Sequence, residues 1–243
     1  MSYKRTIAIL NKAKAMTSGH LDEEPAPKRQ VQDMLGKHPD LQAYLAGEPI
    51  ISREFRVPYL GGISKDGKTV YIDRNLPAKL PKTGIAPGQY IALHERAEWW
   101  LMTRLGMDYL GRNGTYGGHP YAVRIEHDAL EDDGEDPDAY ENELATYIKE
   151  DESARYDPEE LPPDLFLGPY EDDQDSLDRK LLPFLRAAAV RSTGRKLGHA
   201  IATYGPGHSP EFCRNCKHFD RADKVCEYVV DVEPAGWCIL WSR

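Results

Sequence analysis

Residues 90–105 read Y-I-A-L-H-E-R-A-E-W-W-L-M-T-R-L, and this stretch constrains the fold more than any other. The run has the length of a helix, and Gly106 directly after it is a stop signal. His94 and Glu98 are four residues apart, so a helix places both side chains on one face. An imidazole and a carboxylate at that spacing can coordinate one divalent ion. Glu95, which lies between them in the sequence, points to a different side of the same site.

A second helix is expected to bring further polar groups to this site. A glycine-rich loop over residues 110–118 leads into H-P-Y-A-V-R-I-E-H-D-A-L, where a proline near the start suits the first helical turn. His119 and Glu126 are seven residues apart, about two turns, so they share a face. Ala122 between them is small enough to let two helices approach closely. The two helices predict a divalent metal site, and ordinary helix-surface groups are the alternative interpretation.

A β-hairpin is expected before these helices. Two β-rich runs, Val57–Ser64 and Thr69–Asp73, flank the turn sequence K-D-G-K. A strand beside a motif helix can hold an extended peptide substrate by β-augmentation. Helices are also expected over residues 3–16, around a break at Gly36 and Pro39, near Pro137–Glu150 and near Ser176–Ala202.

The order of these motifs resembles the H-E-x-x-E metallopeptidase-like proteins of bacteriophages and prophages, over about residues 57–130. The resemblance implies a zincin-like fold and a metal, zinc in enzymes of this kind, held by His94, Glu98 and His119. It implies Glu95 as the general base. Glu126 is expected to orient His119 or to complete the coordination. Glu98 stands where H-E-x-x-H enzymes have a second histidine, and a carboxylate oxygen is also a zinc ligand.

All four cysteines fall near the end of the chain, with the spacing C-x2-C, nine residues, C, eleven residues, C. In a reducing compartment clustered cysteines favour metal binding, and two disulfides are the alternative. Structural zinc modules usually pair two C-x2-C knuckles, whereas only the first pair here is a knuckle. Unequal spacings suit a cubane cluster better than zinc.

The end motifs of this stretch, C-R-N-C-K-H-F and G-W-C-I-L-W, resemble the high-potential iron–sulfur proteins over about residues 213–241. The resemblance implies that each cysteine binds one iron of a [4Fe–4S] cluster, the ligands being Cys213, Cys216, Cys226 and Cys238. An aromatic shell would raise the cluster potential, and five aromatic residues stand nearby: Phe212, Phe219, Tyr228, Trp237 and Trp241.

The net charge of −9 is unevenly spread along the chain. Residues 126–178 carry more than half of the 40 acidic side chains, so a solvated linker is expected there. Mean hydropathy is −0.62, and no apolar run approaches the roughly 20 residues of a membrane helix. No signal peptide is recognisable. These properties predict a cytoplasmic or virion-associated protein without a membrane or a specific nucleic-acid partner.

Together these features predict an α+β protein with a zincin-like helical domain, a β-hairpin and a small four-cysteine metal-cluster module. The expected divisions are an N-terminal helical segment (1–50), a metal domain (51–150), an acidic linker (151–178) and a helix with the iron–sulfur module (179–243). The predicted function is a phage-type metallopeptidase acting on a protein or peptide, with other phage particle proteins as candidate partners. The rival hypothesis is a non-enzymatic structural or assembly protein whose metal and cluster sites brace the fold or sense redox state. An independent electron-transfer role ranks last, because no G-x-G-x-x-G motif follows a strand.

Overall fold

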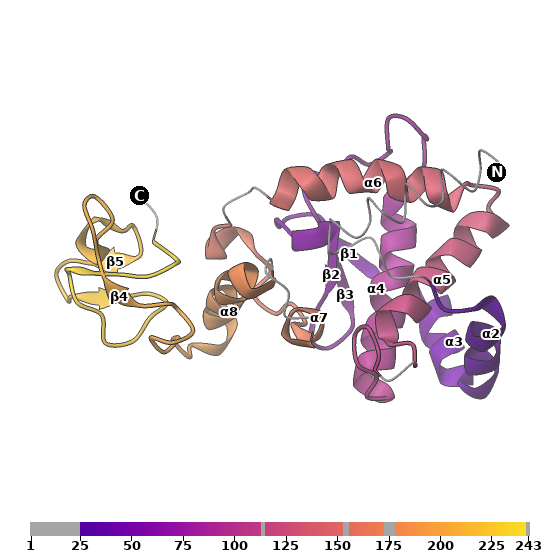
Figure 1. Cartoon of the computed structure of the whole chain (residues 1–243), viewed down its shortest axis with the longest axis horizontal. Helices are drawn as coiled ribbons and strands as arrows, with labels where there is room; N and C mark the ends of the chain where they lie inside the picture. Colours follow the sequence, from indigo (N-terminus) through magenta and orange to yellow (C-terminus); the bar gives the residue numbers. More distant parts are fainter. Residues whose placement is uncertain (1–24, 113–114, 153–155, 173–177, 242–243) are drawn as a thin grey trace, which may run out of the picture. The chain divides into compact units, whose positions relative to one another are not determined.

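The computed structural model describes residues 25–112, 115–152, 156–172 and 178–241, and the protein is α+β (Figure 1). The helix expected over residues 3–16 lies outside the described residues. The chain forms two compact units, Met1–Pro49 with Pro77–Lys149 (unit 1), and Ile50–Leu76 with Glu150–Arg243 (unit 2). The β-rich segment thus belongs to unit 2 and the motif helices to unit 1, although both fall within the domain expected over 51–150. No helix in the described part of the chain is long and apolar enough to cross a membrane.

Unit 1 is built from helices. They are α2 (Lys28–Lys37), α3 (Pro39–Ala46), α4 (Pro87–Arg104), α5 (Gly118–Asp132) and most of α6 (Pro137–Glu152). Pro39 starts α3, as expected, because proline suits the first helical turn. The break expected at Gly36 is wrong, since this residue lies inside α2.

Helices α4 and α5 pack side by side and form the centre of unit 1 (Figure 1). Ala97 on α4 and Ala122 on α5 are both fully buried, so small side chains occupy the inner faces of both helices. Helix α4 begins at Pro87, before the expected start at Tyr90, and Gly106 follows its end with a φ of 67°. A positive φ is readily adopted by glycine, which is why the helix stops here.

Arg96 joins α4 to the end of α3. Its guanidinium is buried and donates hydrogen bonds to the backbone carbonyls of Tyr44, Leu45 (3.1 Å) and Gly47 (2.6 Å). These carbonyls lie at the C-terminal end of α3, where helical carbonyls lack partners within the helix. Arg96 therefore caps α3, while His94 and Glu98 on the same helix remain available for another role.

The loop between α4 and α5 requires glycine at two positions. Gly111 has a φ of 95°, and the N–H of Gly117 donates to the carbonyl of Leu110 at 2.9 Å. A Cβ atom on Gly117 would lie 2.2 Å from the carbonyl oxygen of Tyr109. The N–H of His119 also donates to that carbonyl, at 3.0 Å, so the tight loop sets where α5 starts.

Unit 2 contains a three-stranded sheet of order β1-β3-β2, formed by β1 (Ile50–Ser52), β2 (Gly61–Ile63) and β3 (Thr69–Ile72). The antiparallel β2–β3 pair confirms the predicted hairpin, and Gly67 in its turn has a φ of 73°. The first half of the expected strand Val57–Ser64 is wrong, because a 3-10 turn, η1 (Pro58–Leu60), occupies it. Strand β1, which pairs in parallel with β3, was not expected.

The acidic segment is more than a solvated linker. It contains the 3-10 turn η2 (Pro158–Glu160) and helix α7 (Gly168–Asp172), and its apolar side chains Leu161, Leu165 and Tyr170 pack in the core of unit 2. Helix α8 (Asp178–Thr193) packs in the same core. The expected extension of this helix to Ala202 is wrong, because Gly194 follows its end with a φ of 66°.

The cysteine-rich end of the chain consists of short elements. Strand β4 (Gly205–Pro206) pairs with β7 (Gly236–Trp237), β5 (Phe219–Asp220) pairs with β6 (Val225–Cys226), and η3 spans Cys213–Asn215. Such short strands offer little core of their own. The cysteines lie at or next to the ends of these elements.

Candidate metal centre

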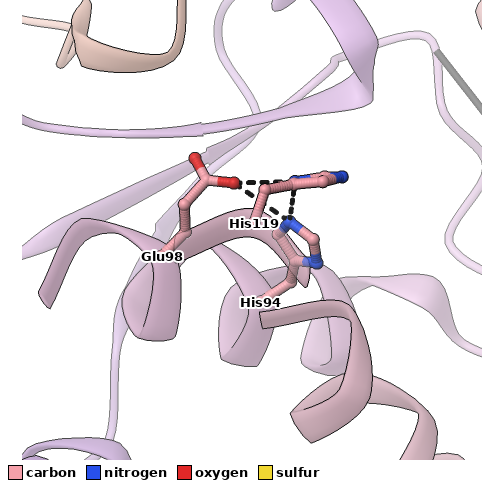
Figure 2. A group of neighbouring side chains, drawn as sticks. All are labelled: His94, Glu98 and His119. Carbon is pink, nitrogen blue, oxygen red and sulfur yellow. Dashed lines mark hydrogen bonds and ion pairs between the residues drawn. The ribbon is translucent and has the colours of Figure 1, made fainter. Parts of the chain in front are cut away.

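Three of the predicted ligands converge between α4 and α5. The ligand atoms of His94, Glu98 and His119 all lie within 4.8 Å of one another. Nε2 of His94 is 3.2 Å from Nδ1 of His119, and Oε2 of Glu98 lies 2.8 Å from the same Nδ1 atom. Figure 2 shows the three side chains pointing toward one another. The spacing of four residues on α4 and the start of α5 thus place two imidazoles and one carboxylate at a single point.

Glu126 contacts His94 rather than His119. Its Oε2 atom lies 2.9 Å from Nδ1 of His94, and its Oε1 atom accepts a hydrogen bond of 2.9 Å from the hydroxyl of Tyr140. Because a carboxylate only accepts, Nδ1 of His94 carries the proton and donates it. Nε2 faces Glu98 and His119, and it offers a lone pair there once the ring has lost its second proton. Glu126 is therefore placed to orient a ligand, and it is not among the three converging groups.

The charges of this cluster stabilise one another. Burial lowers the pKa of His94, but hydrogen bonds to Glu126 and Glu98 outweigh it and raise that pKa well above 6.5. Burial raises the pKa of Glu98, whereas hydrogen bonds from His119 and His94 outweigh it and hold the value at about 2. The pKa of Glu126 is lowered in the same way by His94, against the effect of burial. Both carboxylates are thus anionic at neutral pH, as metal ligands and their supporting groups must be.

Glu95, the predicted base, lies beside this cluster. Burial and the negative charge of Glu98 raise the pKa of Glu95 to about 8, against the opposing influence of His94. The carboxyl group of Glu95 is therefore close enough to the cluster for the charges of Glu98 and His94 to shift its pKa. It is not one of the three converging donors.

Two aromatic residues contact the site although no sequence pattern predicted that they would. Tyr140 reaches Glu126 from α6, and the ring of Tyr109 lies 4.7 Å from that of His119, centroid to centroid. Neither tyrosine stands at a recognisable spacing from the motif. His127, next to Glu126, points elsewhere, with its Nε2 atom 2.5 Å from Oε1 of Glu141.

The four cysteines are buried in the cysteine-rich end of the chain. Burial, together with the other three cysteines and against a backbone hydrogen bond from Leu240, raises the pKa of the Cys238 thiol to about 12. Burial, then Cys226 and Cys216, raise the pKa of Cys213 to about 11. The part of each shift that comes from other cysteines requires sulfur atoms near one another. No disulfide joins any of the four in the described part of the chain, so the two-disulfide alternative is not realised.

Four of the five aromatic residues expected around the cysteines pack against them. Phe219 and Trp241 are buried against Cys213 and Cys216, and Trp237 packs on the same group. Tyr228 is fully buried in the core that includes Cys226 and Cys238. The sulfur atoms thus lie in an apolar surrounding.

Comparison with protein-family models, with curated proteins and with solved structures found no match to this chain.

Proposed function

We propose that this protein is a metal-dependent hydrolase of the peptidase type, with a divalent metal held by His94, Glu98 and His119. The observation that carries the proposal is the bond between Glu126 and His94. It turns the second nitrogen of the imidazole toward Glu98 and His119. Histidine ligands of catalytic metals are commonly held by a carboxylate in this way.

The donor set suits zinc. Two imidazoles and one carboxylate are the protein ligands of several catalytic zinc sites, which keep a further position for water or substrate. The donor atoms lie 2.8, 3.2 and 3.4 Å apart. Ligands about 2.0–2.1 Å from a shared ion are separated by similar distances, about 3.3 Å in a tetrahedron.

A divalent ion in such a site polarises a carbonyl group and lowers the pKa of a bound water molecule. The residues of the chain supply the remaining roles. Glu95 would accept a proton from that water: its pKa is raised to about 8 in the metal-free protein, and the positive charge of a bound dication would lower it, so that the carboxylate form is present near neutral pH. Glu126 and Tyr140 would hold the ring of His94 in one tautomer and orientation. The choice of a peptide bond as substrate rests on the resemblance of the motifs to phage metallopeptidase-like proteins.

For the cysteine module we propose a [4Fe–4S] cluster. A tetrahedral zinc ion with bonds of about 2.3 Å would hold its sulfur ligands about 3.8 Å apart. Among the described residues, no three cysteine sulfurs lie within 4.8 Å of one another. A cubane spreads its ligands over a larger body. The wider spacing of the buried sulfur atoms therefore favours the cluster over zinc.

The test uses the full-length chain, loaded with zinc and incubated with fluorescently labelled casein. Glu95→Gln should abolish cleavage and leave the zinc content unchanged, because Glu95 handles a proton and is not a ligand. His94→Ala should lose both zinc and cleavage. Cleavage retained in Glu95→Gln would remove Glu95 from the mechanism. Bound zinc with no cleavage by the unaltered chain would favour the rival role as a structural or assembly protein of a phage particle.

A further inference from the structure

A second group of potential metal ligands lies in unit 2, apart from both centres described above. The ligand atoms of Glu159, His218 and Glu227 all lie within 4.8 Å of one another. Nδ1 of His218 is 3.4 Å from Oε2 of Glu227 and 3.8 Å from Oε1 of Glu159. Glu159 lies in η2, whereas His218 and Glu227 both belong to the β5–β6 hairpin, far along the chain from η2.

The backbone holds these residues in place. In the β5–β6 hairpin Phe219 pairs with Cys226, so the preceding His218 stands opposite the following Glu227. The N–H of Glu227 donates to the carbonyl of His218 at 2.9 Å and extends the ladder by one pair. Glu159 lies in η2, where the side chain of Asp157 accepts a hydrogen bond of 3.0 Å from its backbone N–H.

One nitrogen of the buried His218 imidazole is left without a hydrogen bond. The side chain is only 2% exposed, and Nε2 has no hydrogen-bond partner among the described residues. The carboxylate oxygen of Asp157 lies 3.9 Å from Nε2, beyond hydrogen-bond range. Nε2 faces Asp157, on the other side of the ring from the two glutamates, so the nitrogen that the buried ring offers to the group is Nδ1. Separations of 3.4 and 3.8 Å from Nδ1 are long for hydrogen bonds but suit atoms that bind one ion, about 3.3–3.6 Å apart.

The local charges leave a site of net charge near −2. The ammonium of Lys217 pairs with Asp157 and also lies 3.4 Å from Oε2 of Glu159. The other oxygen of Glu159 faces His218, together with the carboxylate of Glu227. With Lys217 offsetting Asp157, the two glutamates remain to balance a doubly charged cation.

We propose that Glu159, His218 and Glu227 form a further divalent-cation site, of the Mn²⁺ or Zn²⁺ class that accepts imidazole and carboxylate ligands. The cation would tie η2 to the β5–β6 hairpin. That hairpin carries Cys226, and His218 follows Cys216 by two residues, so the site would brace the cysteine module. Its existence does not depend on the proposed hydrolase activity.

The test counts bound Mn²⁺ on the full-length chain, purified anaerobically with its cysteine centre loaded. The electron paramagnetic resonance signal of free Mn²⁺ reports how much metal remains unbound at each point of a titration. Glu227→Gln and Glu159→Gln should each bind one Mn²⁺ fewer per chain than the unaltered protein. Both side chains are about half exposed, so an isosteric amide is tolerated there. Asp223→Asn is the matched control, because Asp223 is an exposed carboxylate in the same hairpin and lies outside the group.

His94→Ala distinguishes this site from the first one, since it should remove a different bound Mn²⁺. The double variant with His94→Ala and Glu227→Gln should therefore bind two Mn²⁺ fewer per chain than the unaltered protein. Mn²⁺ should also raise the melting temperature of Asp223→Asn more than that of Glu227→Gln. An unchanged Mn²⁺ count in both glutamate variants overturns the proposal. An equal loss in Asp223→Asn also overturns it, because the effect would then be one of general surface charge.

Discussion

Nδ1 of His94 lies 2.9 Å from Oε2 of Glu126, which joins α4 to α5 at the point where the candidate ligands converge. This contact fixes the tautomer of His94, because the carboxylate can only accept the proton on Nδ1. The same contact sends Nε2 toward Glu98 and His119. A residue that is not itself one of the converging donors thus determines which nitrogen of His94 faces them.

Glu126→Gln should weaken zinc affinity by about 10- to 100-fold, because an amide is a weaker acceptor for the imidazole N–H. Competition with a chromogenic chelator measures the affinity. Asp132→Asn, an exposed acidic position on α5, is the control and should bind zinc as the unaltered chain does. An affinity in Glu126→Gln equal to that of the control would show that Glu126 does not support His94.

Tyr140→Phe should destabilise the metal-free protein by about 1–3 kcal/mol, because Oε1 of the buried Glu126 loses its hydrogen-bond donor. Denaturant unfolding followed by circular dichroism measures the change. Tyr147→Phe on the same helix is the comparison, since Tyr147 is only partly buried. Equal stability of the two variants would mean that the hydroxyl of Tyr140 contributes nothing to the cluster.

Zinc affinity should rise with pH above about 6.5, the ordinary pKa of histidine. In the metal-free protein Glu126 and Glu98 raise the pKa of His94 above that value, against burial, and a proton must leave before the imidazole can bind metal. The two carboxylates stabilise the metal-free fold through their contacts with protonated His94. This stabilisation is complete below the pKa of His94 in the unfolded chain, and it is lost as pH rises through the pKa of His94 in the folded protein. Glu98, with a pKa of about 2, stays ionised throughout this window.

Chelator competition at several pH values measures that slope. Glu126→Gln provides the internal control, because it removes a carboxylate that raises the pKa of His94 and should flatten the dependence. A zinc affinity that does not change with pH in the unaltered chain would contradict this assignment of the proton.

Gly117→Ala should destabilise the protein by about 1–3 kcal/mol, because the new methyl group would lie 2.2 Å from the carbonyl oxygen of Tyr109. The loop before His119 would have to shift, so zinc affinity should fall as well. Gly36→Ala is the matched control, since no atom lies within 4 Å of a Cβ there. That change should stabilise α2 by about 0.5–1 kcal/mol. Thermal unfolding that ranks the two variants in the opposite order would contradict the loop geometry.

Cys226→Ser and Cys238→Ser should each lose iron and acid-labile sulfide, together with the visible absorption of a thiolate–iron centre. Both variants should keep the metal of the His94 site, which serves as the control within the same molecule. Elemental analysis after anaerobic purification measures both metals. A colourless unaltered protein that carries zinc on its cysteines would refute the cluster.

The helical part of the candidate site could be predicted because its signals are local. The spacing of His94 and Glu98 follows from one helical turn, and Gly106 marks the end of α4 within two residues. Similarly, the K-D-G-K turn defines the β2–β3 hairpin. Strand β1 could not be foreseen, because its parallel pairing with β3 joins segments separated by many residues and leaves no periodic signal.

Contacts between side chains on different elements could not be predicted from local sequence patterns either. The spacing of His119 and Glu126 placed them on one face of α5, yet it did not reveal that Glu126 contacts His94 on α4. Tyr140 and the group around His218 gave no signal at all. Each depends on residues brought together from separate segments.

The sequence alone predicted the α+β class, the helices that carry the motifs and the types of donor available. All of these depend on residues only a few positions apart in the chain. The tertiary structure decided which donors meet, which nitrogen of His94 is available and where an imidazole lies buried beside two carboxylates. Those outcomes depend on how separate segments pack, and packing is a property of the whole chain that short-range spacing does not encode.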